Sequence, residues 1–236
     1  MRKLINDKSD VLIIFIKYPK AGFVKTRLAQ SIGKVNAARL YQVFVKAVVR
    51  RTESKSFQRM IFYSPAGREK KIRNWLGRNI ILYPQQGRTL GERLSQAFKF
   101  AFKNCAQRVI VIGSDSPTLD TRIILDAFRK LKDAECVIGP ALDGGYYLIG
   151  LSSFYDGIFK GIRWGTKRVF NQTMNKLRQL KINYALLAES FDVDSYSDII
   201  LLKKEMQNAY RRNPLGLAQM YGIVRKLGTG NTKAAP

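Results

Sequence analysis

The side chains best suited to chemistry follow the first apolar run of the chain, Val11–Ile16. The next eleven residues hold four cations, a proline and a glycine, and such a stretch can surround a polyphosphate with cationic and backbone N–H groups. It is not a P-loop, because Val24 stands where that motif requires glycine before the lysine. Thr26 can instead begin a helix whose amino end favours anions. The alternative is a solvated basic loop, but we expect phosphate-binding residues here: Lys17, Gly22, Lys25, Thr26 and Arg27.

Carboxylates are scarce in this sequence, and several of them follow other apolar runs. Asp115 lies in a tight turn directly after Val109–Ile112. Asp192 and Asp194 precede a predicted helix that begins near Ser195, and an N-cap role is the alternative for Asp194. Two or three carboxylates beside a triphosphate suit Mg²⁺, which binds through one or two carboxylates, phosphate oxygens and water.

Two glycine-containing segments are further candidates for a ligand site. Asp143 precedes Gly144-Gly145, and these glycines allow a ligand to approach the backbone closely. In the second segment, Thr89 and Glu92 have the spacing of a capping box at a helix start. That structural explanation leaves three of its residues as candidates for anion binding: Gln86, Gly87 and Arg93.

The composition excludes several classes of function. The chain has no histidine, which removes every His-based triad, metal site and acid–base scheme. Cys105 and Cys136 have no ligand spacing and are expected to be small apolar side chains. The net charge of +25 attracts polyanions in general, but the basic residues are spread along the chain and no nucleic-acid-binding motif is present. We therefore expect no specific nucleic-acid partner.

Apolar runs of strand length alternate with segments of helical periodicity. This alternation predicts a single α/β domain, with a mostly parallel sheet covered by helices on both faces. The expected strands are 11–16, 60–63, 79–83, 108–112, 136–139, 146–151 and 183–187. The expected helices are 35–51, 67–76, 90–104, 121–131, 166–180 and 195–210. The domain should span residues 10–210, followed by a basic amphipathic helix at 211–227 and a disordered tail at 228–236.

The sequence also bears on location. No apolar run approaches the ~20 residues of a membrane span, and Met1–Asp10 lacks the apolar core of a signal peptide. We expect a cytoplasmic protein without a transmembrane segment, and a homo-oligomer is compatible with the sequence.

Six motifs occur in an order that resembles a known family. They are Lys-x-Pro-x-x-Gly-x-Val-Lys-Thr-Arg-Leu at 17–28, Gln-x-Gly-x-x-Leu-Gly-x-Arg-Leu at 85–94, Gly-Ser-Asp-Ser-Pro-Thr-Leu at 113–119, Gly-Pro-Ala-x-Asp-Gly-Gly-Tyr-Tyr-Leu-Ile-Gly-Leu at 139–151, Trp-Gly-Thr at 164–166 and Asp-Val-Asp at 192–194. Together they are similar to the DUF2064 group of glycosyltransferase-like proteins, also linked to arsenosugar biosynthesis. This group is related to 2-phospho-lactate guanylyltransferase within the nucleotide-diphospho-sugar transferase superfamily.

The resemblance covers about residues 10–200 and implies a GT-A type, Rossmann-like sheet with a nucleotide over its first half. It implies that Asp115 binds the metal ion, Mg²⁺ or Mn²⁺. Because position 117 is proline, the second ligand must come from elsewhere, and Asp194 is expected to supply it. The implied catalytic residues are Lys25, Asp115 and Asp143. The residues expected to face the acceptor or sugar are Asp143, Gly144, Gly145, Tyr146, Trp164 and Thr166.

Three functions remain open from the sequence. The leading one is a Mg²⁺-dependent, glycosyltransferase-like transferase that uses a nucleotide-sugar or nucleoside triphosphate and a small-molecule acceptor, with Asp143 as the acceptor base. The second is guanylyltransferase-like nucleotidyl transfer to a small phosphorylated acid or sugar, which the cation-rich first loop favours. The third, from another class, is non-catalytic binding of polyanions through the positive charge.

Overall fold

The computed structural model describes residues 9–212 together with residues 222 and 224. In that part of the chain seven strands form one sheet, in the order β3-β2-β1-β4-β6-β5-β7. The strands are β1 (Asp10–Lys17), β2 (Gln58–Ser64), β3 (Ile81–Pro84), β4 (Arg108–Ile112), β5 (Cys136–Pro140), β6 (Tyr146–Leu151) and β7 (Tyr184–Leu186). The helices are α1 (Thr26–Ile32), α2 (Lys34–Arg51), α3 (Glu69–Leu76), α4 (Leu90–Lys103), α5 (Thr121–Lys130), α6 (Val169–Gln179) and α7 (Tyr196–Arg212). The predicted α/β fold with a mostly parallel sheet is confirmed.

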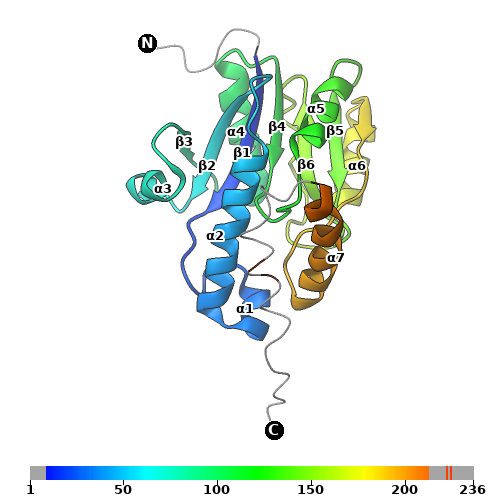
Figure 1. Cartoon of the computed structure of the whole chain (residues 1–236). Coiled ribbons are helices and arrows are strands. Elements are labelled where there is room, and N and C mark those ends of the chain that lie inside the picture. The colour runs from blue at the N-terminus through cyan, green and yellow to red at the C-terminus, as the bar shows by residue number, and fades with distance from the viewer. Residues whose placement is uncertain (1–8, 213–221, 223, 225–236) are drawn as a thin grey trace.

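Strand direction decides where a ligand can bind. β1 pairs in parallel with β2 and β4, β2 with β3, and β5 with β7, whereas β6 is antiparallel to both β4 and β5. The carboxyl ends of β1, β4 and β5 therefore share one edge of the sheet with the amino end of β6 (Figure 1). In open α/β sheets, the crevice outside the carboxyl ends of the strands is where ligands bind.

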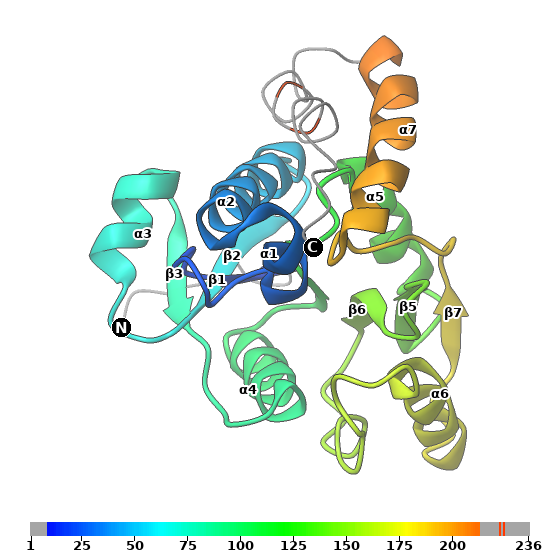
Figure 2. The same ribbon diagram turned by 90° about the horizontal axis from the view of Figure 1, so that it is seen from below.

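Helices cover both faces of the sheet. Successive side chains of β1 point to opposite faces and are apolar, so both faces must be covered. Leu12, Ile14 and Ile16 pack beneath α2, α3 and α5, and Val11 and Ile13 pack with α4 and α6 on the other face (Figure 2). Each fully buried aliphatic side chain of this kind stabilises the fold by about 1.5–3 kcal/mol. The continuous apolar strands are thus explained by burial on both sides.

A third apolar cluster packs α2 against α1 and α7. Leu40 and Phe44 of α2 are fully buried against Leu28 of α1 and Met206 of α7. Val224, one of the two described residues beyond α7, belongs to the same cluster and is also fully buried. The rest of the expected helix at 211–227 beyond residue 212, the tail at 228–236, and residues 1–8 lie outside the described residues.

Two helices begin two or three residues later than the sequence predicts, and glycine explains both differences. α3 begins at Glu69 instead of residue 67, because Gly67 has a left-handed φ of 76°. α6 begins at Val169 instead of residue 166, because Gly165 has a φ of 77° and the Thr166 hydroxyl closes a turn by donating to the Arg163 carbonyl at 2.8 Å. No helix in the described part of the chain combines the length and apolar character that crossing a bilayer requires.

Candidate active site

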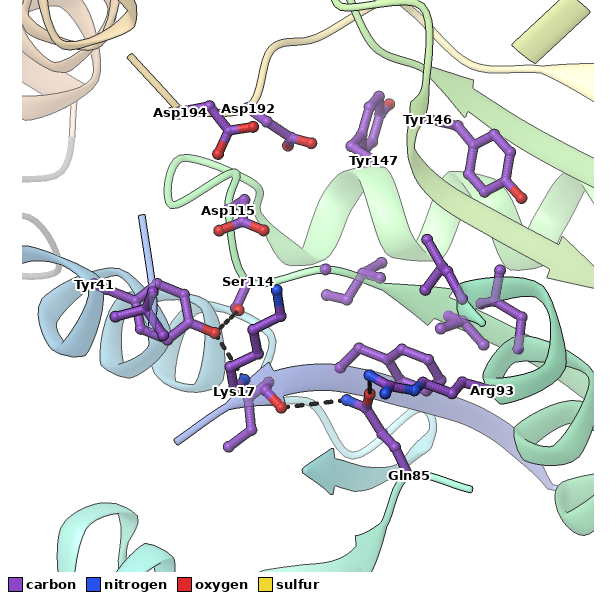
Figure 3. A pocket seen from close by; sticks show the side chains of 18 of the residues that line it. Lys17, Tyr41, Gln85, Arg93, Ser114, Asp115, Tyr146, Tyr147, Asp192 and Asp194 are labelled. Atoms are coloured by element: carbon purple, nitrogen blue, oxygen red, sulfur yellow. Dashed lines mark hydrogen bonds between the residues drawn. The ribbon is translucent and has the colours of Figure 1, made fainter. Parts of the chain in front are cut away.

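A cavity of about 500 Å³ opens at the edge of the sheet where β1 and β4 end. Acids from two loops border one side of it, and Arg93 and Gln85 lie on another (Figure 3). Its floor is apolar and includes Phe15, Val111 and Ile149. A ligand in this cavity would meet carboxylates, cations and an apolar surface together.

Lys25 joins two of the acids. Its Nζ lies 2.5 Å from an oxygen of Asp115 and 2.8 Å from an oxygen of Asp194. The Lys25 side chain is only 3% exposed, whereas each carboxylate is 41% exposed. Burial by itself lowers the pKa of Lys25, but the charges of Asp115 and Asp194 outweigh it and hold that pKa above its ordinary value. Lys25 is therefore a cation at every physiological pH.

The loop between β1 and α1 aims Lys25 at these acids. Gly22 has a left-handed φ of 81°, and the Phe23 N–H donates to the Lys20 carbonyl at 3.0 Å, so the chain turns back toward the sheet. Lys25 itself has φ 47° and ψ 47°, a left-handed conformation that a residue with a side chain seldom adopts. It occupies the N-cap position of α1, immediately before Thr26 and Arg27, which also line the cavity.

A third acid, Asp192, lies beside this pair. Its carboxylate accepts a hydrogen bond from the Ser116 hydroxyl. Burial raises the pKa of Asp192 to about 7, and the neighbouring charge of Asp115 adds to this rise. The Val193 N–H donates to the Asp115 carbonyl at 3.0 Å. This bond ties the segment of Asp192 and Asp194 to the turn after β4.

The alternative N-cap role of Asp194 is not what the structure shows. The backbone N–H groups of Asp194 and Ser195 donate instead to the carboxylate of Asp198, at 3.0 and 2.7 Å. The Asp194 side chain is thereby left to contact Lys25.

Tyr41, on α2, links the ends of β1 and β4 through hydrogen bonds. Its hydroxyl accepts a hydrogen bond from the Lys17 N–H at 2.9 Å and shares one with the Ser114 hydroxyl at 2.8 Å (Figure 3). Burial raises the pKa of Tyr41, and the nearby Asp115 raises it further, so the phenol stays neutral. Tyr41 was not among the residues expected from the sequence, although a polar tip within the inward apolar stripe of α2 was a signal for it.

Gln85 organises the basic side of the cavity. Its amide nitrogen donates to the carbonyls of Ile16 and Phe62, at 3.2 and 2.9 Å, at the ends of β1 and β2. Arg93 donates from Nε to the Gly87 carbonyl at 3.0 Å, and its Nη1 lies 3.5 Å from the Gln85 side-chain oxygen. These contacts hold the guanidinium of Arg93 against the cavity.

The start of α4 largely follows the capping prediction. The Thr89 hydroxyl accepts from the Glu92 N–H at 3.2 Å. The Glu92 carboxylate accepts from the N–H of Arg88, at 2.7 Å, one residue before the expected position. Gly87 is required here for structural reasons, because a Cβ on it would lie 2.9 Å from the backbone nitrogen of Arg93.

The structure brings only part of the expected site together. The expected residues that line the cavity are Lys17, Lys25, Thr26, Arg27, Arg93, Asp115, Tyr146 and Asp194. Those that do not line it are Gly22, Gln86, Gly87, Asp143, Gly144, Gly145, Trp164 and Thr166. Lining residues outside the expected set include Tyr41, Gln85, Arg88, Ser114, Tyr147 and Asp192.

The segment around Asp143 has a structural explanation of its own. The Asp143 side chain is directed to its own turn, where it accepts from the Gly145 N–H at 2.9 Å. A Cβ on Gly144 would lie 2.2 Å from the Lys167 carbonyl oxygen, so only glycine fits this contact. Trp164 packs over Gly91 in the same way, since a Cβ there would come within 2.5 Å of the indole nitrogen.

The donor set suits one divalent cation. Asp115 and Asp194 already share a single cation, and two carboxylates with phosphate oxygens and water complete a usual Mg²⁺ shell. Among the described residues no group of three or more acidic or cysteine side chains is arranged to hold a metal ion. A metal ion here would therefore depend on the nucleotide for its remaining ligands.

The seven-stranded α/β fold is that of the nucleotide-diphospho-sugar transferases. A protein of Desulfovibrio desulfuricans G20, provisionally assigned as such a transferase, has a solved structure with a TM-score of 0.86 to this chain. The two are 34% identical, over 94% of this chain and 95% of the other. The family described as "Uncharacterized protein conserved in bacteria (DUF2064)" matches residues 47–166. The chain belongs to the DUF2064 family, as its motifs predict, and is a transferase.

More distant structures share the fold. The 4-diphosphocytidyl-2C-methyl-D-erythritol synthase of Anaerococcus prevotii DSM 20548 has a TM-score of 0.56 at 12% identity, over 85% of this chain and 96% of its own. A CMP:2-keto-3-deoxy-manno-octonic acid synthetase in complex with CTP has a TM-score of 0.50 at 12% identity, over 85% and 99%. No curated protein matches the sequence.

Proposed function

We propose that the protein is a divalent-metal-dependent nucleotidyltransferase that transfers a nucleotidyl group from a nucleoside triphosphate to a small phosphorylated acid or sugar. One observation carries this proposal: five cations line the same cavity as the pair of acids, which matches a triphosphate with its metal ion. The cations are Lys17, Lys25, Arg27, Arg88 and Arg93.

The reaction needs little covalent chemistry from the protein. An oxygen of the acceptor phosphate forms a bond to the α-phosphorus, the bond from that phosphorus to the bridging oxygen breaks, and pyrophosphate leaves with the electron pair. A phosphate carries about −1.5 to −2 charge at neutral pH, so the attacking oxygen requires no base. Catalysis then depends on positioning the two substrates and on stabilising charge.

The roles of the residues follow from their positions. Asp115 and Asp194 would hold Mg²⁺ or Mn²⁺, which when bound offsets negative charge on the phosphate oxygens. Lys17, Lys25 and Arg27 would bind the phosphates and stabilise the departing pyrophosphate. The apolar floor would contact the uncharged parts of the substrates.

Glycosyl transfer is the second candidate, and the relative at 34% identity favours it through its assignment. In that reaction a nucleoside diphosphate leaves from a sugar, and the acceptor hydroxyl requires a base. Asp143, the expected base, does not line the cavity. This placement counts against glycosyl transfer and adds to the reason, the five cations, for ranking nucleotidyl transfer first.

The test uses purified protein with each nucleoside triphosphate and each common nucleotide-sugar, with Mg²⁺ or Mn²⁺ and a panel of phosphorylated acids and sugars. Release of pyrophosphate from a triphosphate supports nucleotidyl transfer. Release of a nucleoside diphosphate from a nucleotide-sugar supports glycosyl transfer and contradicts the first proposal.

Asp115→Asn is the decisive variant in that assay. Removing one electrostatic contact to the reacting centre commonly costs on the order of 100-fold in rate, and loss of a metal ligand should cost at least that. The matched control is Asp126→Asn on α5, whose carboxylate pairs with Arg129. Equal activity of the Asp115→Asn variant and the parent would show that the metal assignment is wrong.

The polyanion-binding alternative predicts a different dependence of binding on metal ions and salt. Binding of nucleic acid through bulk positive charge needs no divalent metal and weakens steeply with salt. Nucleotide binding that requires Mg²⁺ and persists at high salt would contradict it.

A further inference from the structure

The acid pair of the site already has a cation, and it belongs to the protein. The Lys25 ammonium lies between Asp115 and Asp194, within hydrogen-bond distance of one oxygen of each. This is the position in which a divalent cation held by both carboxylates would lie. An ammonium group and a divalent cation cannot share it, because like charges a few ångström apart repel strongly in a partly buried site.

The two carboxylates and the lysine differ in their access to the cavity. Asp115 and Asp194 each keep 41% of their side chain exposed, whereas Lys25 keeps 3%. A metal ion can therefore approach the carboxylates from the open side without first unfolding the loop. The lysine side chain is a flexible stem of four methylenes, so its ammonium can move by several ångström while its backbone stays in place.

The surroundings offer the displaced ammonium more anionic partners when a nucleotide is bound. Lys25 lines the same cavity as Lys17, Arg27 and Arg93, where the proposed phosphates would lie. Without phosphate, a displaced Lys25 would face those cations, and the remaining acid in the cavity lining, Asp192, already accepts a hydrogen bond from a serine hydroxyl. With phosphate present, it would exchange two carboxylate contacts for phosphate contacts of similar strength.

We propose that the Lys25 ammonium is a built-in counter-ion that a divalent cation must displace, so that metal ion and nucleotide bind cooperatively through Lys25. This inference rests on the proposed function, because it takes Asp115 and Asp194 as the metal ligands. In the absence of nucleotide the site binds metal weakly, and the phosphates make the exchange favourable. By linkage, the metal strengthens nucleotide binding by the same factor as the nucleotide strengthens metal binding.

The first experiment is a calorimetric titration with Mn²⁺ in the absence of nucleotide. Lys25→Met removes the competing charge while keeping an unbranched side chain, and we expect it to bind Mn²⁺ at least tenfold more tightly than the parent. Lys25→Arg keeps the charge and should bind Mn²⁺ as weakly as the parent. Lys20→Met is the matched control, because Lys20 is on the same loop and lies over the Phe23 ring, 4.3 Å from its centroid.

The outcomes separate this inference from the proposed function. If Mn²⁺ binds and Asp115→Asn abolishes binding, but Lys25→Met does not tighten it, the metal site is correct and the counter-ion role is wrong. If Mn²⁺ binds neither the parent nor Lys25→Met, with or without a nucleoside triphosphate, the proposed metal site itself is wrong.

A second measurement uses the parent protein and needs no variant to fold. Acetic anhydride labels deprotonated, accessible lysines, and mass spectrometry reports the extent at each one. Lys25 should be protected in the metal-free protein, because its side chain is 3% exposed and its ammonium is held between two carboxylates. Saturating Mn²⁺ should increase labelling of Lys25 at least fivefold while labelling of Lys20 stays constant. Equal labelling of Lys25 with and without bound Mn²⁺ would overturn the displacement.

Discussion

Arg27 lies exposed at the edge of the cavity, two residues after Lys25. A charge-assisted contact to phosphate is worth about 1.5–3 kcal/mol, and an exposed one should fall at the lower end of that range. We predict that Arg27→Ala weakens nucleoside triphosphate binding about tenfold. Lys46→Ala, on the exposed side of α2, should leave it unchanged. Fluorescence titration with a labelled triphosphate measures both, and equal losses would indicate that only bulk charge matters.

Tyr41 is a residue whose role only the structure shows. Tyr41→Phe leaves the Lys17 N–H, which is partly buried, without its acceptor, and this should cost about 1 kcal/mol, the lower end of the range for an unsatisfied donor. It also frees Ser114, which precedes Asp115, so we predict a lower unfolding free energy together with weaker Mn²⁺ binding. Urea unfolding and metal titration measure the two effects.

Tyr155→Phe is the control for the loss of a tyrosine hydroxyl group. It removes a hydrogen bond to Glu135, which lies away from the cavity. This variant should lose stability without any change in Mn²⁺ affinity. Unchanged Mn²⁺ affinity in Tyr41→Phe as well would show that Tyr41 does not position the metal site.

Some of the residues predicted from sequence line the cavity, and their local context in the chain is informative. Lys25, Asp115 and Asp194 each follow an apolar strand or precede a helix, and the structure joins these three in one ion-pair cluster. Tyr41 and Gln85 act through contacts to segments far away in the chain, at separations of 73 and 69 residues. The polar tip of Tyr41 within the apolar stripe of α2 was a local signal for that residue, but nothing near Tyr41 or Gln85 in the sequence indicates which distant segments they contact.

At the scale of elements, the number of strands and their positions along the chain followed from the apolar runs, but their order in the sheet and the direction of β6 did not. β5 and β6 are joined by a five-residue connection, residues 141–145, too short for the crossover that parallel neighbours require. That length was a usable signal for an antiparallel pair. The reversal brings Tyr146 and Tyr147, at the start of β6, to the edge of the sheet that carries the site.

The turn between β5 and β6 allows a direct test of its glycine. Gly144 has a φ of 85° and lies against the Lys167 backbone, so Gly144→Ala combines backbone strain with a steric clash. We predict a loss of at least about 2 kcal/mol in unfolding free energy, of which roughly 1 kcal/mol is the left-handed conformation.

Gly161→Ala is the matched control for that variant. Gly161 has a φ of 76°, but among the described residues no neighbouring atom lies within 4 Å of the point that a Cβ would occupy. Only the conformational cost of about 1 kcal/mol therefore applies. Chemical denaturation of both variants measures the difference. Equal losses would show that the contact with Lys167 is not part of the folded state.

At the scale of the whole molecule, the acidic and basic residues are unevenly distributed. The chain carries 42 basic and 17 acidic residues, and three of those acids meet at one cavity. The positive field of the remaining surface should draw nucleotides toward this acid-containing site and raise the rate of encounter. This steering is general, however, and weakens with ionic strength. Selectivity must therefore come from the cavity, where buried groups are screened less.

The last prediction concerns the segment after α7, whose sequence 214–227 has the apolar spacing of an amphipathic helix next to basic residues. Such a segment could contact an anionic membrane if its apolar side were free. Val224 is instead fully buried with Leu28, Phe44 and Met206, so at least this part of the apolar side is taken up by α1, α2 and α7. We predict that the purified protein, freed of nucleic acid, does not co-sediment with phosphatidylserine-containing liposomes at physiological salt.

A variant truncated after Arg212 provides a second test of this prediction. Removing Val224 exposes its apolar contacts, and the loss of one buried valine should lower the unfolding free energy by about 1.5–3 kcal/mol. Liposome binding should be absent before and after truncation, because Val224 packs on α1, α2 and α7 of its own protein. Strong co-sedimentation of the full chain that disappears on truncation, with stability unchanged, would contradict the packing of Val224 and would place the acceptor of the reaction at a membrane surface.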